Sequence, residues 1–329
     1  MTYGIGRRAF FQTIAVVVPT FRPSPSLRPV SPELAGFVRA AADRSAANAQ
    51  APITSEWGAP VLDIHLHPRA TVEANLLHLD GSGVTKAVLL TGANAEERAK
   101  QTVAAHHGRF VRFASIDMTQ PDAIDRLRMA VQNGAIGFGE IKSQVEAAGP
   151  EMQRLYALAT ELDVPITIHF QEVSQPGSPG TFNRGLKKFD AMLKAYPKTT
   201  FVGHADAFWA NVSADYAEDT SYPKGPIKPG GVTDRFLGEY PNLYADMSAN
   251  SGNNFLNRDP EFAARFLERH QNKLMFGSDC PCPDGRGGTS GRCIARATLT
   301  TLKKLASPEV FRKIVWENGA RVLTNRRPA

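Results

Sequence analysis

Histidines and carboxylates stand at the ends of several short apolar runs in this 329-residue sequence. The first such run ends in Asp63-Ile64-His65-Leu66-His67. Side chains two positions apart on a strand point the same way, so His65 and His67 would aim at one place. Two converging imidazoles can grip a metal ion, although this spacing alone is as typical of an ordinary surface pair.

The other candidate residues also stand at the ends of apolar runs. They are Glu140, His169, His204 and Asp279. Four of the eight histidines in the sequence occupy such ends, which random placement would rarely produce. The remaining four lie in or near helical patterns and are predicted to be solvated surface groups: His78, His106, His107 and His270. Because metal sites recruit histidine and carboxylate, the pattern predicts a divalent metal site.

Bringing these residues together requires a regular alternation of strands and helices. Short β-branched runs predict strands at residues 61–67, 86–92, 109–117, 135–142, 165–170, 199–205, 243–249 and 273–280. Apolar residues at helical spacing predict helices at residues 96–107, 122–133, 151–163, 186–196, 260–272, 297–305 and 308–323. Eight such units predict an α/β fold, a single-domain (β/α)₈ TIM barrel of residues 59–329. An open doubly wound sheet is the alternative, but it would usually carry a Gly-rich phosphate turn that this sequence lacks.

Long Pro/Gly-rich connections follow the fifth, sixth and eighth predicted strands, at residues 171–185, 206–231 and 281–291. In a barrel these loops lie on the side where active sites form, so they are predicted to wall a substrate pocket. The candidate substrate contacts on them are Gln171, Arg184 and Trp209, with ordinary solvated loop groups as the alternative. Asp63 is predicted to orient His65, or else to be a buried packing residue. Asp206 is predicted to hold the tautomer of His204, or else to be a simple loop residue.

Composition and charge disfavour several classes of function. No run approaches the roughly 18 apolar residues of a membrane span. The net charge is +6, but no Lys/Arg block is interleaved with aromatic residues, which argues against a nucleic-acid partner. The expected partner is a small-molecule substrate, and a homodimer is an open alternative to a monomer. Cys280, Cys282 and Cys293 are odd in number and close in sequence, which favours loop thiols near the active site over a Cys282–Cys293 disulfide.

Residues 1–58 differ from the rest and are predicted to be an N-terminal extension. Arg7-Arg8 precede an apolar run at residues 13–18, the pattern of a twin-arginine export signal. Ala47-Asn48-Ala49 offers a cleavage point. The signal predicts a periplasmic protein, and a Pro-rich extension on a cytoplasmic protein is the alternative.

The combined motifs resemble the amidohydrolase superfamily. The His-x-His pair, the two strand-end histidines and Gly277-Ser278-Asp279 form its metal pattern. The 276–279 and 316–321 stretches are similar to its amidohydrolase-related ("amidohydrolase 2") branch. The resemblance covers residues 60–325 and implies a metal-dependent TIM-barrel enzyme. That branch contains hydrolases, lactonases, hydratases and nonoxidative decarboxylases.

The resemblance also implies a ligand set. One divalent ion, usually Zn²⁺, would be held by His65, His67, His169 and Asp279, with His204 free to polarise the substrate. Glu140 matches a position that bridges two ions in some relatives, in which case His169 and His204 would serve the second ion. Lys142 faces the same side as Glu140. It is a carboxylated bridging ligand, an anchor for a substrate carboxylate, or a lysine that seals the barrel mouth.

The expected chemistry is the hydrolysis of an amide, ester or lactone. A bound zinc ion lowers the pKa of its water to about 7. Asp279 would accept the proton and pass it to the leaving group, while the metal or His204 would stabilise the oxyanion. A metal-dependent nonoxidative decarboxylase of an aromatic or unsaturated acid is the alternative, and the site residues do not discriminate between the two. A catalytically silent metal-binding protein is disfavoured because no member of the set is missing.

Overall fold

The computed structural model describes residues 55–175 and 180–324 of the chain. Eight parallel strands follow one another in chain order, so the predicted TIM barrel is confirmed. Each observed strand falls within its predicted range and most are shorter than predicted. They are β1 (Leu62–Leu66), β2 (Lys86–Gly92), β3 (Phe110–Ser115), β4 (Phe138–Ile141), β5 (Ile166–His169), β6 (Phe201–His204), β7 (Leu243–Asp246) and β8 (Leu274–Met275).

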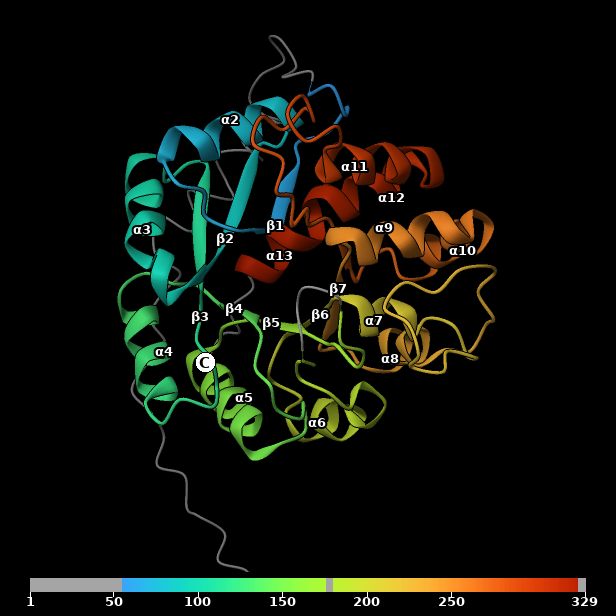
Figure 1. Cartoon of the computed structure of the whole chain (residues 1–329), viewed down its shortest axis with the longest axis horizontal. Coiled ribbons are helices and arrows are strands. Elements are labelled where there is room, and N and C mark those ends of the chain that lie inside the picture. Colours follow the sequence, from blue (N-terminus) through green and yellow to red (C-terminus); the bar gives the residue numbers. More distant parts are fainter. Residues whose placement is uncertain (1–54, 176–179, 325–329) are drawn as a thin grey trace, which may run out of the picture. The chain divides into compact units, whose positions relative to one another are not determined.

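Helices form an outer ring around the strands (Figure 1). Those that overlap the predicted ranges are α3 (Glu96–Ala105), α4 (Ala123–Gln132), α5 (Pro150–Leu162), α6 (Asp190–Ala195), α10 (Pro260–Arg269), α11 (Ile294–Leu305), α12 (Pro308–Arg312) and α13 (Asn318–Thr324). A π-helical turn, η3 (Lys313–Glu317), joins the last two, and 3₁₀ turns η1 (Ala93–Ala95) and η2 (Leu186–Lys188) precede α3 and α6. Four helices were not predicted: α2 (Val72–Ser82), α7 (Asp206–Ala210), α8 (Val232–Glu239) and α9 (Ala249–Arg258). Of these, α7 lies inside a segment expected to be a loop.

The seam between the last strand and the first is held mainly by bonds outside the regular ladder. Strand β8 has only two residues, and beyond it Phe276 accepts a bond from the Ile64 N–H at 3.1 Å. The Asp279 N–H donates to the His65 carbonyl at 2.8 Å. The buried Asp63 carboxylate accepts from the backbone N–H of Ser278 at 2.9 Å. The seam therefore carries Asp279 directly to the end of β1.

The 316–321 stretch anchors β8 through Asn318. The fully buried Asn318 amide donates to the carbonyl of Leu274 at 2.7 Å and to that of Gln271 at 2.7 Å. A polar side chain buried this deeply is stable only because both bonds are made. The anchor holds the strand from which Asp279 extends.

Two histidines expected at the surface are buried, so that prediction was wrong for them. His78 is 0% exposed, and its Nδ1–H donates to the Cys282 carbonyl at 2.8 Å. His270 is 4% exposed, and its Nε2 lies 2.6 Å from the Asp234 carboxylate. Each imidazole has a polar partner, which is what makes burial of such a group tolerable.

The proposed export signal at Arg7-Arg8 and the Ala47–Ala49 stretch lie outside the described residues. Within the described ranges, none of the helices combines the length and apolar character needed to cross a membrane.

Candidate metal centre

The strand-end residues predicted to form a metal site meet at one end of the barrel in two groups. The ligand atoms of His65, His67 and Asp279 lie within 4.8 Å of one another. Those of Glu140, His169 and His204 form a second group on the same criterion. Parallel strands end on the same side, so residues up to 214 positions apart in the chain converge here.

Glu140 lies between the two groups. Its Oε2 is 3.4 Å from His67 Nε2 and 3.9 Å from His65 Nε2. Its Oε1 is 3.3 Å from His204 Nε2 and contacts His169 Nδ1 closely. Burial opposes ionisation of Glu140, but the surrounding imidazoles, His169 foremost, hold its pKa well below the usual range. One carboxylate oxygen therefore faces each group.

Asp246, at the end of β7, is a member of the site that the sequence analysis missed. It is 0% exposed, and its Oδ2 lies 2.5 Å from His65 Nδ1 and 3.5 Å from His204 Nδ1. A Cβ added to Gly277 would stand 2.5 Å from Asp246 Oδ1, so only glycine lets the carboxylate reach His65. Its position at a strand end, two residues before Ser248, was the signal that could have found it.

The carboxylates give the cluster a strong attraction for positive charge. Burial alone would lower the pKa of His65, but Asp246, followed by Asp279 and Glu140, raises it to about 10. The pKa of His204 is lowered, first by burial and then by the nearby His65. The carboxylates around His65 therefore favour positive charge at this end of the barrel.

The residues fit a divalent cation. His65 Nε2 is buried and has no hydrogen-bond partner among the described residues, while Nδ1 is committed to Asp246. His67 Nδ1–H donates to the Leu90 carbonyl at 3.1 Å, which leaves the Nε2 lone pair 3.4 Å from Asp279 Oδ1. Such acceptors behind metal-ligating histidines fix the tautomer that presents Nε2 to the ion.

A pocket of about 640 Å³ opens over both groups. Lys142 lines it, with Nζ 3.9 Å from Glu140 Oε1 and 5.6 Å from the centre of the Phe182 ring. Gln171 also lines it, and its Oε1 lies 3.1 Å from His169 Nε2. Both residues are thus where the sequence placed them, at the mouth beside the histidines.

Two other predicted substrate contacts do not lie at this pocket. Trp209 is 2% exposed, donates from its indole N–H to the Asp246 carbonyl at 2.8 Å and stacks on Phe255 at 4.7 Å between ring centres. It packs in the core because α7 turns its side chain inward, where it supports Asp246. Arg184 is absent from the pocket lining, and its guanidinium lies 3.9 Å from Glu146 in a solvent-exposed pair.

The two predicted supporting aspartates also have different partners. Asp63 accepts the backbone N–H of His65 at 3.0 Å rather than contacting its ring, and burial raises the pKa of Asp63 to about 7. Asp206 lines the pocket, and both its carboxylate oxygens are buried without a hydrogen-bond partner in the described part of the chain. The Nδ1 atom of His204 contacts Ser248 Oγ at 2.9 Å instead.

The sequence matches the family model described as Amidohydrolase over residues 57–217 and 232–324. No curated protein sequence matches the chain. Among solved structures, a probable 2-pyrone-4,6-dicarboxylic acid hydrolase from Acinetobacter baumannii, with citric acid bound, aligns with a TM-score of 0.56 and 14% identity over 80% of this chain and 98% of the other. A 5-carboxyvanillate decarboxylase from Novosphingobium aromaticivorans, complexed with manganese, aligns with a TM-score of 0.52 and 13% identity over 82% of this chain and 97% of the other. A TatD homologue from Escherichia coli aligns with a TM-score of 0.51 and 14% identity over 82% of this chain and 98% of the other. At these identities the structural likeness shows the fold alone.

Proposed function

Because the chain belongs to the amidohydrolase family, we propose that it is a metal-dependent hydrolase that directs water onto an amide, ester or lactone carbonyl. The observation that carries this proposal is the position of Asp279. Its carboxylate stands 3.4 Å from His67 Nε2 and borders the pocket, so a proton acceptor lies beside a cation site and open to substrate.

We propose two adjacent cation positions that share Glu140. His65, His67 and Asp279 would hold one, His169 and His204 the other. A divalent cation supplies Lewis acidity, which lowers the pKa of water and polarises a carbonyl oxygen. Oxygen and imidazole ligands suit Zn²⁺ and Mn²⁺ alike, so the donor set favours a divalent ion without selecting one.

Asp279 is held for proton transfer by its backbone. Its φ of +43° belongs to the left-handed region, and its N–H is fixed by the His65 carbonyl at 2.8 Å. The side chain is 29% exposed, so its free oxygen can accept a proton from a water molecule in the pocket. The same carboxyl group then donates that proton to the leaving group, a role that general acid–base catalysis requires.

His204 is suited to hold the second ion. Burial lowers its pKa, which favours the neutral imidazole, and Ser248 and Asp246 both lie at its Nδ1. With Nδ1–H directed at these oxygens, the lone pair on Nε2 would be presented to the ion. An ion held there would supply the positive charge that stabilises negative charge developing on the substrate.

The pocket favours a substrate that carries its own carboxylate. Lys142 and Arg69 both line it and supply positive charge, and the buried Asp206 lines it as well. A carboxylate on the substrate could pair with Lys142, and a hydroxyl or amine could donate to the unpartnered oxygens of Asp206. The proposed class is a small carbonyl compound with one anionic group and one hydrogen-bond donor.

The test is a panel of carboxylated lactones, esters and amides, assayed with metal-loaded protein in heavy-oxygen water. Hydrolysis incorporates one solvent oxygen into the product. Asp279→Asn is expected to lower turnover by about a hundred- to ten-thousandfold with the fold retained, because the proton acceptor is lost. Asp125→Asn, on the exposed face of α4, is the matched control. Unchanged turnover in Asp279→Asn removes this residue from the mechanism.

A metal-dependent decarboxylase is the second candidate, favoured by Lys142. An ammonium group beside the cation site could hold the carboxylate that leaves an aromatic or unsaturated acid. The manganese-containing 5-carboxyvanillate decarboxylase has the same barrel. Release of CO₂ from an aromatic acid, without solvent oxygen in the organic product, would replace the hydrolase proposal with this one.

A further inference from the structure

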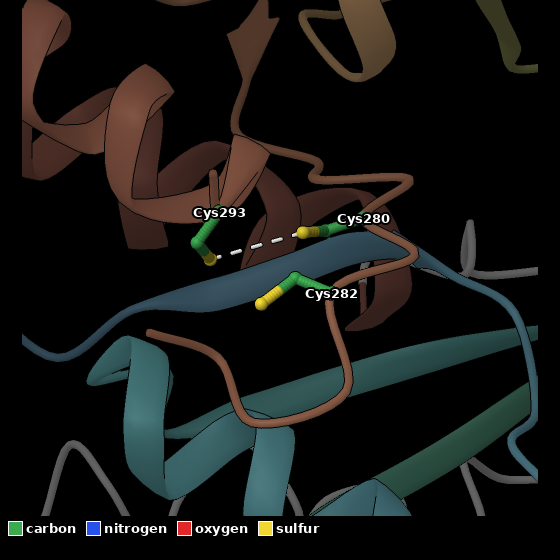
Figure 2. A group of neighbouring side chains, drawn as sticks. All are labelled: Cys280, Cys282 and Cys293. Atoms are coloured by element: carbon green, nitrogen blue, oxygen red, sulfur yellow. Dashed lines mark hydrogen bonds between the residues drawn. The ribbon is translucent and has the colours of Figure 1, made fainter. Parts of the chain in front are cut away.

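The three cysteines of the chain converge beside the metal centre. Cys280 and Cys282 follow Asp279, and Cys293 lies just before α11. All three are buried, and their sulfur atoms lie within 4.8 Å of one another. Figure 2 shows the side chains pointing into a common space from the loop after β8 and the start of α11.

The separation of the sulfurs suits a shared ion better than a disulfide. Cys280 Sγ and Cys293 Sγ are 3.8 Å apart, well beyond the roughly 2.05 Å of an S–S bond. Two thiolates bound to zinc at about 2.3 Å with tetrahedral angles stand about 3.8 Å apart. The Cys280–Cys293 distance is therefore compatible with two ligands of one tetrahedral thiolate site.

The surroundings stabilise negative charge on Cys280, whereas its hydrogen bond to Cys293 and burial raise the pKa of the Cys293 thiol. Backbone N–H groups of Cys282, Ile294 and Ala295 are directed at Cys280, and the Gly287 N–H donates to Cys282 Sγ at 3.1 Å. The Ile294 and Ala295 amides belong to the positive N-terminal end of α11. The Arg69 guanidinium, which bonds to the Cys280 carbonyl at 2.8 Å, interacts favourably with all three sulfurs.

We propose that Cys280, Cys282 and Cys293 form a second metal site, for a thiophilic d¹⁰ ion such as Zn²⁺, separate from the histidine–carboxylate centre. Three S–H bonds break and three S–metal bonds form, with three protons released to solvent and no electron transferred. Three thiolates and the Asp284 carboxylate, which accepts a hydrogen bond from Cys282 Sγ at 3.0 Å, carry four negative charges, of which one divalent ion and the Arg69 guanidinium offset three. A solvent molecule completes the fourth position.

This site would tether the turn that carries Asp279. The ion joins Cys280, the next residue along the chain, to Cys293 at the start of α11, and so closes residues 281–292 into a short loop. The role is positioning rather than catalytic, because no sulfur needs to touch the substrate. It rests on the cysteine geometry alone and does not depend on which reaction the enzyme performs.

The test uses reduced, metal-free protein titrated with Co²⁺. Thiolate ligands give an intense near-ultraviolet sulfur-to-cobalt charge-transfer band that histidine and carboxylate ligands do not. We expect this band in the wild type and in the His65→Asn/His67→Asn double variant, which disables the other centre. Hydrogen exchange of residues 281–292 should slow when the band is saturated, in both proteins.

Cys282→Ser is expected to weaken the Co²⁺ affinity of this site by at least about tenfold. Loss of a residue that only hydrogen-bonds to a metal ligand typically costs about ten- to hundredfold in affinity, and loss of a ligand itself should cost no less. Thr289→Ala, exposed in the same loop, is the matched control and should keep the band. Protection of the wild-type thiols from alkylation by one equivalent of Zn²⁺ gives a readout that needs no variant. Absence of the band at Co²⁺ saturation, with all three thiols still freely alkylated, overturns the proposal. So does a purified chain that contains a Cys280–Cys293 disulfide and binds no Co²⁺ after reduction.

Discussion

Replacing Asp246 by asparagine tests whether the carboxylate behind the histidines organises the metal centre. The substitution keeps the side-chain size but removes the charge that faces His65 Nδ1 at 2.5 Å and His204 Nδ1 at 3.5 Å. Partners behind metal-bound histidines typically contribute ten- to hundredfold in metal affinity. Asp246 serves one histidine in each group, so we expect a loss near the upper end, about a hundredfold or about 2.7 kcal/mol.

The assay is competition for Zn²⁺ against a chromophoric chelator, with thermal unfolding measured in parallel. The matched control is Asp234→Asn, because Asp234 also pairs with a buried histidine, His270, at 2.6 Å, but outside the site. The control should lower the unfolding temperature and leave Zn²⁺ affinity unchanged. Equal Zn²⁺ affinity in Asp246→Asn and the wild type, or an equal loss in both variants, would refute the reasoning.

Three further outcomes follow from the same geometry. Glu140→Gln removes the charge shared by the two groups. Measured by elemental analysis in a Cys282→Ser background, it should lower the metal content from two ions per chain to one or fewer, whereas the exposed Glu146→Gln should not. A single ion in the Cys282→Ser parent contradicts the shared position. The His65→Ala/His67→Ala double variant should lose the ion held with Asp279, and full occupancy would place the metal elsewhere. Burial lowers the pKa of His78 from 6.5 to about 4. The free energy of unfolding should therefore be highest above pH 6.5 and fall by about 3 kcal/mol as the pH drops towards 4, because the unfolded chain binds the proton more tightly. Urea unfolding with chelator present should show this loss in the wild type and a smaller one in His78→Asn; equal pH slopes would contradict it.

The barrel and the convergence of its ligands could be predicted from the sequence because both depend on local pattern. Alternation of apolar strands with helical spacing determines the fold class, and parallel strands place their ends together whatever lies between. Position at a strand end was enough to identify five of the candidate ligands: His65, His67, Glu140, His169 and Asp279. Their division into two groups around Glu140 was one of two arrangements that the family resemblance implied. Local pattern could not choose between the two, because the choice depends on side-chain directions set by the closed barrel.

The residues that were misplaced show where local pattern fails. Trp209 stands in a Pro/Gly-rich stretch, yet α7 turns it into the core against Phe255. His78 lies in α2 and His270 directly follows α10. A histidine alone does not show whether its position faces solvent or the core, and both are buried. Asp246 was missed since a lone carboxylate on a short strand carries no motif, and only its contact with His65 reveals its role.

The short strand β8 has a thermodynamic consequence. His65 and His67 lie on the β1 side of the barrel seam, and Asp279 lies on the β8 side. An ion held by all three would therefore bridge the seam between the first and the last strand. Ligand binding to the closed form stabilises it by about 3 kcal/mol when free ion is a hundredfold above its Kd. Loss of the cation would then loosen the architecture as well as the chemistry, and metal supply would set the lifetime of the folded enzyme.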